Sequence, residues 1–368
     1  MGSGSSSSVE QKITSRIASF DLLKFILAVC IVCHHYQQDF GYDYPLINFY
    51  GGTFYVGNLV ELFFILSGFF MAEQIDKYKQ SSFGQFFIRR YFRLFPMAFI
   101  STTVCTIVHI IYYTRTGNWL SVEVNLFTYL KGILLVFVGW CFPVEAQLSI
   151  NSPLWMVCVL LMCYVIYWLL IKLSELAKIS DKYLFGVMTF LGISLYYIDC
   201  EIPFLGQPSA RGYMSFFWGV LLGTIFEENN RWLKERKIQV MTISCFSLVM
   251  IIGTSIKNIS FVGGYSDSKF IWVYVVYPLI MLFLFFVKFD DKTNNILFLL
   301  GSISFEMYVW HYPLISVLRL INDTLIVLPN GDWMMVGFVV ALIVVCSVLY
   351  CVVERPITAW VNRLIAIS

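Results

Sequence analysis

The chain has 368 residues, of which 59% are hydrophobic and 13% are charged, and its formal net charge is +2. Soluble globular domains carry about a quarter charged residues, so this composition excludes an ordinary soluble domain and indicates an integral membrane protein. A net charge this close to neutral also gives no reason to expect a nucleic-acid partner.

Residues 1–14 are rich in glycine and serine, and we expect a disordered leader there. The next apolar run is too long for a cleavable signal, so we expect it to stay in the protein as the first span. We expect residues 15–358 to form one transmembrane domain and residues 359–368 to form a cytoplasmic tail. Apolar runs long enough to span a bilayer occur at residues 17–36, 54–73, 92–113, 153–173, 183–199, 212–225, 238–255, 270–288, 296–320 and 333–352.

One further apolar run, 125–140, decides the topology. If it crossed the membrane, the lysines at 172–182 and all later basic loops would change sides. If it is instead a re-entrant or interfacial helix of the outer leaflet, the basic loops all face the cytoplasm, which is the positive-inside pattern. We therefore predict an all-α polytopic protein of the plasma membrane with about ten transmembrane helices and both termini cytoplasmic.

The first predicted span carries Asp21 and Lys24 near one end and His34 and His35 at the other. Lys24 and His35 are eleven residues apart, which places them on one helix face, separated by roughly 16 Å along the axis. Asp21 is an (i, i+3) neighbour of Lys24 and can pair with it. The simpler interpretation is a structural ion pair with the histidines among headgroups. Charges inside a membrane favour the alternative, a polar track along one face of the helix with a functional role.

The second and third spans add further polar groups. Glu61 is either a structural carboxylate with its own hydrogen-bond partners or a member of the site. Ser67, beside a glycine, permits close helix packing. Arg89, Arg90 and Arg93 open the third span, with Arg93 the deepest by position. They are either membrane anchors or a site for phosphate groups.

Aromatic and polar residues also gather in the predicted outer segment and the helices that follow it. Trp140 and Glu145 lie between the third and fourth spans, Trp155 opens the fourth, and Arg211 precedes the sixth. Aromatic surfaces suit stacking against sugar rings, although interfacial tryptophan belts and anchors are competing explanations. Cys141 and Cys200 fall in predicted outer loops, where a disulfide between them is compatible with the sequence.

The ninth span contains the stretch Gly301–Pro313, in which Tyr308 and His311 share a helix face. Pro313 disrupts helical hydrogen bonding and frees backbone groups that can line a cavity. His109, in the third span, is instead interpreted as a packed core histidine. Glu354 to Pro356 closes the last span and predicts a helix end at the proline.

These stretches, from Arg16 to Pro356, resemble the acyltransferase-3 family of integral-membrane acyltransferases. The family's hallmark is a basic residue, ten residues and a histidine, which Lys24 and His35 match with lysine in place of the commoner arginine. Some branches have glutamate where this chain has Leu160. That departure favours the exopolysaccharide or capsule O-acetyltransferase branch.

The resemblance implies transfer of an acetyl group from cytoplasmic acyl-coenzyme A to a hydroxyl of an extracytoplasmic or lipid-linked glycan. His35 is then the general base, with His34 as its substitute and Asp21 orienting Lys24, which steadies the donor or the thioester carbonyl. Implied donor contacts are Lys24, Arg89, Arg90, Arg93, Ser67, Tyr308 and His311. Implied acceptor contacts are Trp155, Arg211 and Trp140. Glu61 and Glu145 are alternative partners of His35, and a covalent acyl-histidine intermediate is left open.

The competing hypothesis is an exopolysaccharide or small-molecule transporter without acyl-transfer chemistry. Inverted repeats would favour it, and the sequence has no convincing internal repeat. We expect acetyl-coenzyme A, a glycan and membrane lipids as partners and no metal, because the cysteines lack metal-ligand spacing. An oligomer is compatible with the sequence.

Overall fold

The structure is a computed structural model that describes residues 16–41, 48–50, 56–133, 149–198, 202, 204–257, 267–329 and 331–367. Within these ranges every regular element is a helix, which confirms the predicted all-α class. The longer helices are α1 (Ala18–Phe40), α2 (Leu59–Ala72), α4 (Phe83–Thr116), α7 (Trp155–Ala177), α8 (Asp181–Ile198), α9 (Gln207–Glu228), α11 (Lys237–Lys257), α15 (Asp291–Thr324), α16 (Asp332–Leu349) and α17 (Arg355–Ile367).

Shorter elements connect these helices. The short α-helices are α3 (Ile75–Gln80), α5 (Leu126–Ile133), α10 (Asn230–Glu235), α13 (Asp267–Ile271) and α14 (Tyr277–Phe285). Two 3₁₀ turns, η1 (Val56–Asn58) and η3 (Ser152–Leu154), precede α2 and α7. Two π-helical turns, η4 (Trp272–Val276) and η5 (Tyr350–Glu354), join α13 to α14 and α16 to α17.

Each predicted span coincides largely with helix in the structure. Four stretches of the described chain are long and apolar enough to cross a bilayer: Ala18–Phe40, Phe83–Thr116, Ser152–Ala177 and Asp332–Val361. This supports the membrane class, while the count of ten spans stays a prediction. In the ambiguous run 125–140, the described part of the helix is α5, and the rest of the run lies outside the described residues. Leu126 and Phe127 of α5 are exposed, as on a surface helix.

The predicted helix end at Pro356 is wrong. Helix α16 passes through the π-helical turn η5 into α17, which continues to Ile367, so most of the predicted tail is helical. Pro356 directly follows this π-helical turn, where the regular α-helical hydrogen-bond pattern is already interrupted.

Helices α2 and α9 approach each other closely because glycines face their backbones. A Cβ added at Gly68 would collide with the carbonyl of Phe216, and one added at Gly219 would collide with the carbonyl of Ile65. Small residues at a membrane helix interface permit such close packing. The predicted packing role of the glycine beside Ser67 therefore fits the structure.

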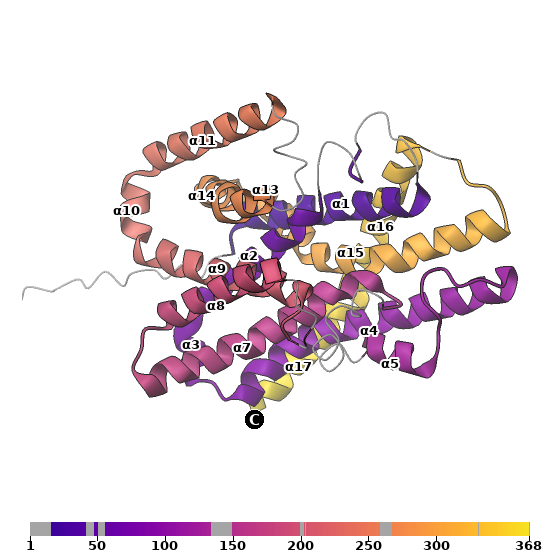
Figure 1. The fold of residues 1–368 in the computed structure, drawn as a ribbon, viewed down its shortest axis with the longest axis horizontal. Coiled ribbons are helices and arrows are strands. Elements are labelled where there is room, and N and C mark those ends of the chain that lie inside the picture. The colour runs from indigo at the N-terminus through magenta and orange to yellow at the C-terminus, as the bar shows by residue number, and fades with distance from the viewer. Residues whose placement is uncertain are drawn as a thin grey trace, which may run out of the picture.

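Helix α1 is the element that positions the predicted site. It lies along α15, and α15 in turn packs against α4 (Figure 1). At the start of α1, the Asp21 side chain fits against Gly301 of α15, where any larger residue would overlap it. The Ser19 hydroxyl donates to the Leu284 carbonyl of α14 at 2.7 Å, which fixes the same end of α1.

Candidate active site

One end of α1 carries a network of charges centred on Asp21. This carboxylate is 1% exposed and accepts hydrogen bonds from Arg16 Nε at 2.5 Å and Lys24 Nζ at 3.1 Å. The predicted pairing of Asp21 with Lys24 is therefore confirmed. Arg16 also donates to the Phe298 carbonyl at 2.6 Å, which ties the network to α15. The Lys24 ammonium lies 4.5 Å from the centre of the Phe70 ring of α2, so it faces the α2 side of α1.

The other end of α1 carries imidazoles. The His35 ring stacks on the His311 ring of α15 with centroids 5.0 Å apart and an interplanar angle of 24°. We call these two rings the histidine pair. His35 Nδ1 lies 3.0 Å from Gln38 Oε1, an oxygen that can only accept, so Nδ1 carries the proton and Nε2 keeps its lone pair. His34 packs edge-on against His35, and its Nδ1 lies 3.0 Å from the Phe49 carbonyl.

His311 has the same arrangement of its ring nitrogens. Its Nδ1 lies 3.2 Å from the Met307 carbonyl, so this nitrogen is the donor and Nε2 is the acceptor. His311 is fully buried, and among the described residues its Nε2 has no hydrogen-bond partner. Within the described part of the chain, His311 therefore retains an uncommitted basic nitrogen, and the Nδ1 bond of His35 leaves its Nε2 as the basic nitrogen.

Pro313 and Asn151 shape α15 around the histidine pair. Pro313 has no N–H to donate to the Val309 carbonyl one turn earlier, and Asn151 Nδ2 donates to that carbonyl instead, at 3.1 Å. The neighbouring Tyr308 hydroxyl donates to the Pro153 carbonyl at 2.6 Å. The segment preceding α7 thus supplies the hydrogen bond that the disrupted helix lacks, and it fixes the position of His311.

The surface that connects the two ends of α1 belongs to α2. On α1 itself, Ala28 and Ile31 lie between Lys24 and His35 on the same face and are buried, so the predicted polar track along α1 is interrupted by packed apolar side chains. All residues of α2 are buried apart from four that share one face. These half-buried residues, here named the α2 stripe, are Leu59, Phe63, Ser67 and Phe70.

The α2 stripe reaches from the charged end of α1 toward the histidine pair. Phe70 lies under Lys24, and the Phe63 ring lies 6.3 Å from the ring of Tyr308. Tyr308 in turn lies 5.8 Å from the ring of His311. Partly exposed side chains of α2 therefore extend from Lys24 toward the histidine pair, the two groups that the sequence singled out.

The three arginines of α4 take different positions. The Arg90 guanidinium lies 5.4 Å from the rings of both Tyr78 and Tyr164, and it also contacts the Tyr78 hydroxyl. The Tyr164 hydroxyl lies near the Ser67 side chain, so Arg90 stands one residue away from the α2 stripe. Arg93 is close enough to interact electrostatically with Lys24. Arg93 is exposed and Arg90 is half-buried.

Glu61 lies in a buried cluster with two cations. Its carboxylate is fully buried and accepts bonds from Arg211 Nε at 2.6 Å and Nη2 at 3.0 Å, and its Oε1 lies 3.1 Å from Lys269 Nζ. The Arg211 guanidinium also lies 4.8 Å from the centre of the Trp155 ring. The structure thus joins Glu61, Arg211 and Trp155, three predicted site residues. Glu61 is committed to its two cations, and the partner of His35 is Gln38.

Some predicted residues lie outside the described residues, namely Trp140, Glu145, Cys141 and Cys200. Other polar residues of the site were missed by sequence reasoning: Gln38, Asn151, Lys269 and Glu306. Gln38 could have been found as an (i, i+3) neighbour of His35, whereas the partners of Asn151 and Lys269 are distant in sequence. Glu306 is fully buried, and neither of its carboxylate oxygens has a hydrogen-bond partner within the described chain.

His109 is fully buried in α4, as expected for a core histidine. Within the described residues, no group of three histidine, cysteine or acidic side chains is arranged to hold a metal ion. The candidate site is therefore defined by imidazoles at one end of α1, ion pairs at the other and the α2 stripe between them.

Comparisons with known proteins show the family to which the chain belongs. Residues 17–352 match the family described as an acyltransferase domain, so the chain belongs to the acyltransferase-3 family. A protein of Acidianus two-tailed virus, ORF330, named as a candidate acetyltransferase, is 21% identical over 283 residues, which are 72% of this chain and 74% of its own. No solved structure matches the chain. Membership supports acyl transfer as the general activity.

Proposed function

We propose that this protein is a membrane-bound O-acetyltransferase. It moves an acetyl group from cytoplasmic acetyl-coenzyme A to a hydroxyl of an extracytoplasmic or lipid-linked glycan, with His35 as general base. The observation that carries this proposal is the histidine pair at one end of α1, connected by the α2 stripe to cations at the other end. This separation, roughly 16 Å along the helix, suits a donor with a long flexible arm between its phosphates and its thioester.

The proposed reaction follows from the protonation of His35. A glycan hydroxyl donates its hydrogen bond to Nε2, which accepts the proton as the oxygen attacks the thioester carbonyl. The tetrahedral intermediate then collapses, the carbon–sulfur bond breaks, and the proton on Nε2 passes to the departing thiolate. Gln38 holds Nδ1–H throughout, so the imidazolium forms without a change of ring orientation. His311, stacked on His35, keeps the ring plane fixed.

Lys24 serves the donor rather than the reacting carbonyl in this proposal. Helix α1 is continuous from Ala18 to Phe40, so Lys24 cannot reach a thioester that lies beside His35. Lys24 and Arg93 instead provide positive charge for donor phosphates, and Asp21 holds Lys24 in place. The glycan is assigned to the side of the histidine pair on which Tyr308, Arg211 and Trp155 lie.

The test uses purified protein in nanodiscs with radiolabelled acetyl-coenzyme A and a panel of oligosaccharides. We expect acetyl transfer and release of coenzyme A, and we expect His35→Ala to reduce transfer by about 10²- to 10⁴-fold while binding of coenzyme A persists. Normal transfer by His35→Ala would show that the base is another group. Absence of both coenzyme A binding and transfer would favour a transporter.

A further inference from the structure

The buried ionic cluster around Glu61 holds more positive than negative charge. Glu61 lies in α2, Arg211 in α9 and Lys269 in α13, so three separate helices bring these groups together. Arg211 Nε and Lys269 Nζ both contact Glu61 Oε1, at 2.6 Å and 3.1 Å. These three described side chains, here named the Glu61 cluster, therefore combine two cations with one carboxylate.

Burial makes this imbalance of charge costly. Glu61 and Lys269 are buried, and the Arg211 side chain is 16% exposed. A charge removed from water needs an opposite charge to compensate the lost solvation, and here two cations share one carboxylate. The rings of Trp155 and Tyr196 lie 4.8 Å and 4.5 Å from Arg211 and Lys269, respectively, and orient these cations without neutralising them. An anionic ligand would balance the cluster.

Polar groups without partners lie beside the Glu61 cluster. Ser215 and Trp218 follow Arg211 on one face of α9, at i+4 and i+7. Ser215 is fully buried, and within the described chain neither its hydroxyl nor Trp218 Nε1 has a hydrogen-bond partner. Asn58, next to the carbonyl of Gly57 that accepts from Arg211, is buried, and its Oδ1 has no partner there either. Such groups are rare in native structures and indicate a polar ligand or bound water.

The Glu61 cluster lies near the proposed base. Arg211 is close enough to Tyr308 to interact with it electrostatically, and the Tyr308 ring lies 5.8 Å from the ring of His311. An acceptor whose charged group is held by the cluster therefore has its neighbouring hydroxyls on the side of the histidine pair.

We propose that the acceptor is anionic and that the Glu61 cluster binds its negative group, with Lys269 as the residue that selects for this charge. This inference rests on the proposed function, because it names the class of acceptor for the same site. The negative group is either the carboxylate of an acidic sugar or a phosphate that links the glycan to its lipid. Both have oxygens that accept charge-assisted hydrogen bonds from lysine.

The experiment measures binding of two matched pairs of radiolabelled probes to the full-length protein in phosphatidylcholine nanodiscs. The first pair is a tetrasaccharide of alternating glucuronic acid and N-acetylglucosamine and its carboxyl-reduced counterpart. The second is N-acetylglucosamine joined to farnesol through pyrophosphate or directly. We expect the charged member of one pair to bind about tenfold or more tightly than its neutral counterpart, because hydrogen bonds between charged groups are strong. The pair that shows the preference identifies the source of the charge.

Two variants of Lys269 test the assignment. Lys269→Gln removes one cation and leaves Glu61 with Arg211, so it should bind both members of each pair with equal affinity. Lys269→Arg keeps the charge and should keep most of the preference. The wild-type comparison tests the proposal even where Lys269→Gln fails to fold. Equal binding within both pairs by the wild-type protein, or a preference that survives in Lys269→Gln, would overturn it.

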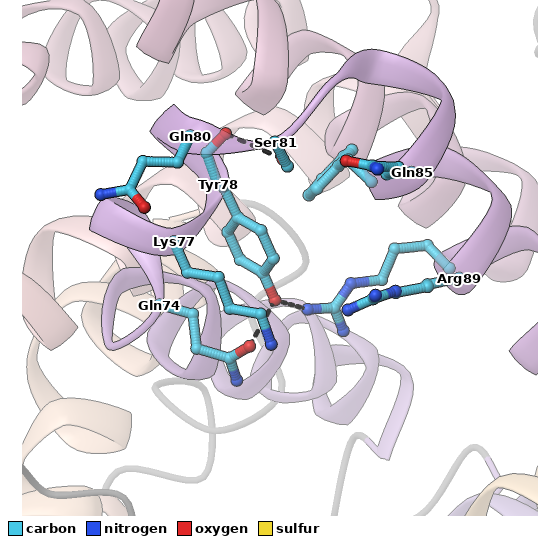
Figure 2. A pocket seen from close by; sticks show the side chains of 9 residues that line it. Gln74, Lys77, Tyr78, Gln80, Ser81, Gln85 and Arg89 are labelled. Atoms are coloured by element: carbon cyan, nitrogen blue, oxygen red, sulfur yellow. Dashed lines mark hydrogen bonds between the residues drawn. The ribbon is translucent and has the colours of Figure 1, made fainter. Parts of the chain in front are cut away.

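The matched control is Lys77→Gln. Lys77 lines a separate cavity of about 370 Å³, between α3 and the start of α4, to which Arg89 and Arg90 also contribute positive charge (Figure 2). Removing the charge of Lys77 should leave the preference for the anionic probe unchanged. A preference lost in Lys77→Gln but kept in Lys269→Gln would place the anion in that cavity and overturn the proposal.

Binding also separates this inference from the proposed function. If the preference for the anionic probe depends on Lys269 but no acceptor receives an acetyl group, the anion site stands and the proposed reaction fails. If transfer depends on His35 while charged and neutral acceptors are bound and acetylated equally, the reaction stands and the anion site fails.

Discussion

At the scale of single residues, Asn151 supports a helix that proline has disrupted. Its amide donates to the carbonyl of Val309, which Pro313 leaves without a backbone partner. We predict that Asn151→Ala lowers the free energy of unfolding by roughly 1–3 kcal/mol, because the buried carbonyl is left unpaired. Unfolding in mixed detergent micelles, followed by circular dichroism, measures this change.

The control is a double-mutant cycle with Pro313→Ala, which restores an N–H one turn after Val309. The double variant should be less destabilised than the sum of the two single variants by about 1 kcal/mol. Strict additivity would mean that Asn151 does not stabilise the helix through this carbonyl.

Residue pairs differ in how far the sequence could predict them. Asp21 and Lys24 are three residues apart on one helix, so their pairing follows from helix geometry. Glu61 and Arg211 are 150 residues apart, and their pairing depends on how α2 packs against α9. The sequence therefore left Glu61 as a candidate partner of His35, and packing instead assigns its carboxylate to Arg211 and Lys269.

At the scale of helices, glycines determine how closely α2 and α9 pack. We predict that Gly219→Ala destabilises the protein by roughly 1–3 kcal/mol, because its new methyl group would meet the backbone of Ile65. Gly337→Ala is the matched control. It lies in α16, where an added Cβ meets nothing within 4 Å, so it should stabilise by about 0.5–1 kcal/mol. Equal effects of both substitutions on the melting temperature would contradict this account of the interface.

The start of α15 gives a prediction for pH. Asp290 caps this helix, and Thr293 donates to its carboxylate from both its hydroxyl, at 2.5 Å, and its backbone N–H, at 3.3 Å. These bonds favour the ionised form and hold the pKa of Asp290 below its usual value of 3.8. The cap should therefore stabilise the fold above pH 3.8 and lose this contribution as the pH falls through the lowered pKa.

Melting temperatures of Asp290→Ala and Asp290→Asn across a pH series measure this effect. Asp290→Ala should melt below the wild-type protein at neutral pH and approach it in acid. Asp290→Asn keeps a capping group that does not titrate, so its difference from Asp290→Ala should not depend on pH. A difference between Asp290→Ala and the wild-type protein that is constant over the whole series would exclude a charged cap.

The helices themselves were largely predictable, because apolar runs of bilayer length exclude most other structures. The ends of the helices were less predictable. The sequence indicates a stop at Pro356, but the π-helical turn at Tyr350–Glu354 leads into α17 and places the proline in its first turn. Such turns depend on local packing and leave no periodic pattern in the sequence.

At the scale of the whole molecule, the candidate site extends across several helices. Cations lie near one end of α1, the histidine pair lies at the other, and the α2 stripe passes between them. The sequence predicted both ends from the spacing of Lys24 and His35. It did not predict that the connecting surface belongs to α2, because Ala28 and Ile31 of α1 are buried by tertiary packing.

The most direct test of the separate roles of Lys24 in donor binding and His35 in catalysis is a kinetic comparison of Lys24→Gln and His35→Gln over a range of acetyl-coenzyme A concentrations. The account predicts that Lys24→Gln raises KM for the donor and leaves kcat within about twofold, because it removes donor binding alone. It predicts that His35→Gln lowers kcat by about 10²- to 10⁴-fold with little change in KM. A Lys24→Gln enzyme with an unchanged KM and a collapsed kcat, or a His35→Gln enzyme with a normal kcat, would contradict it.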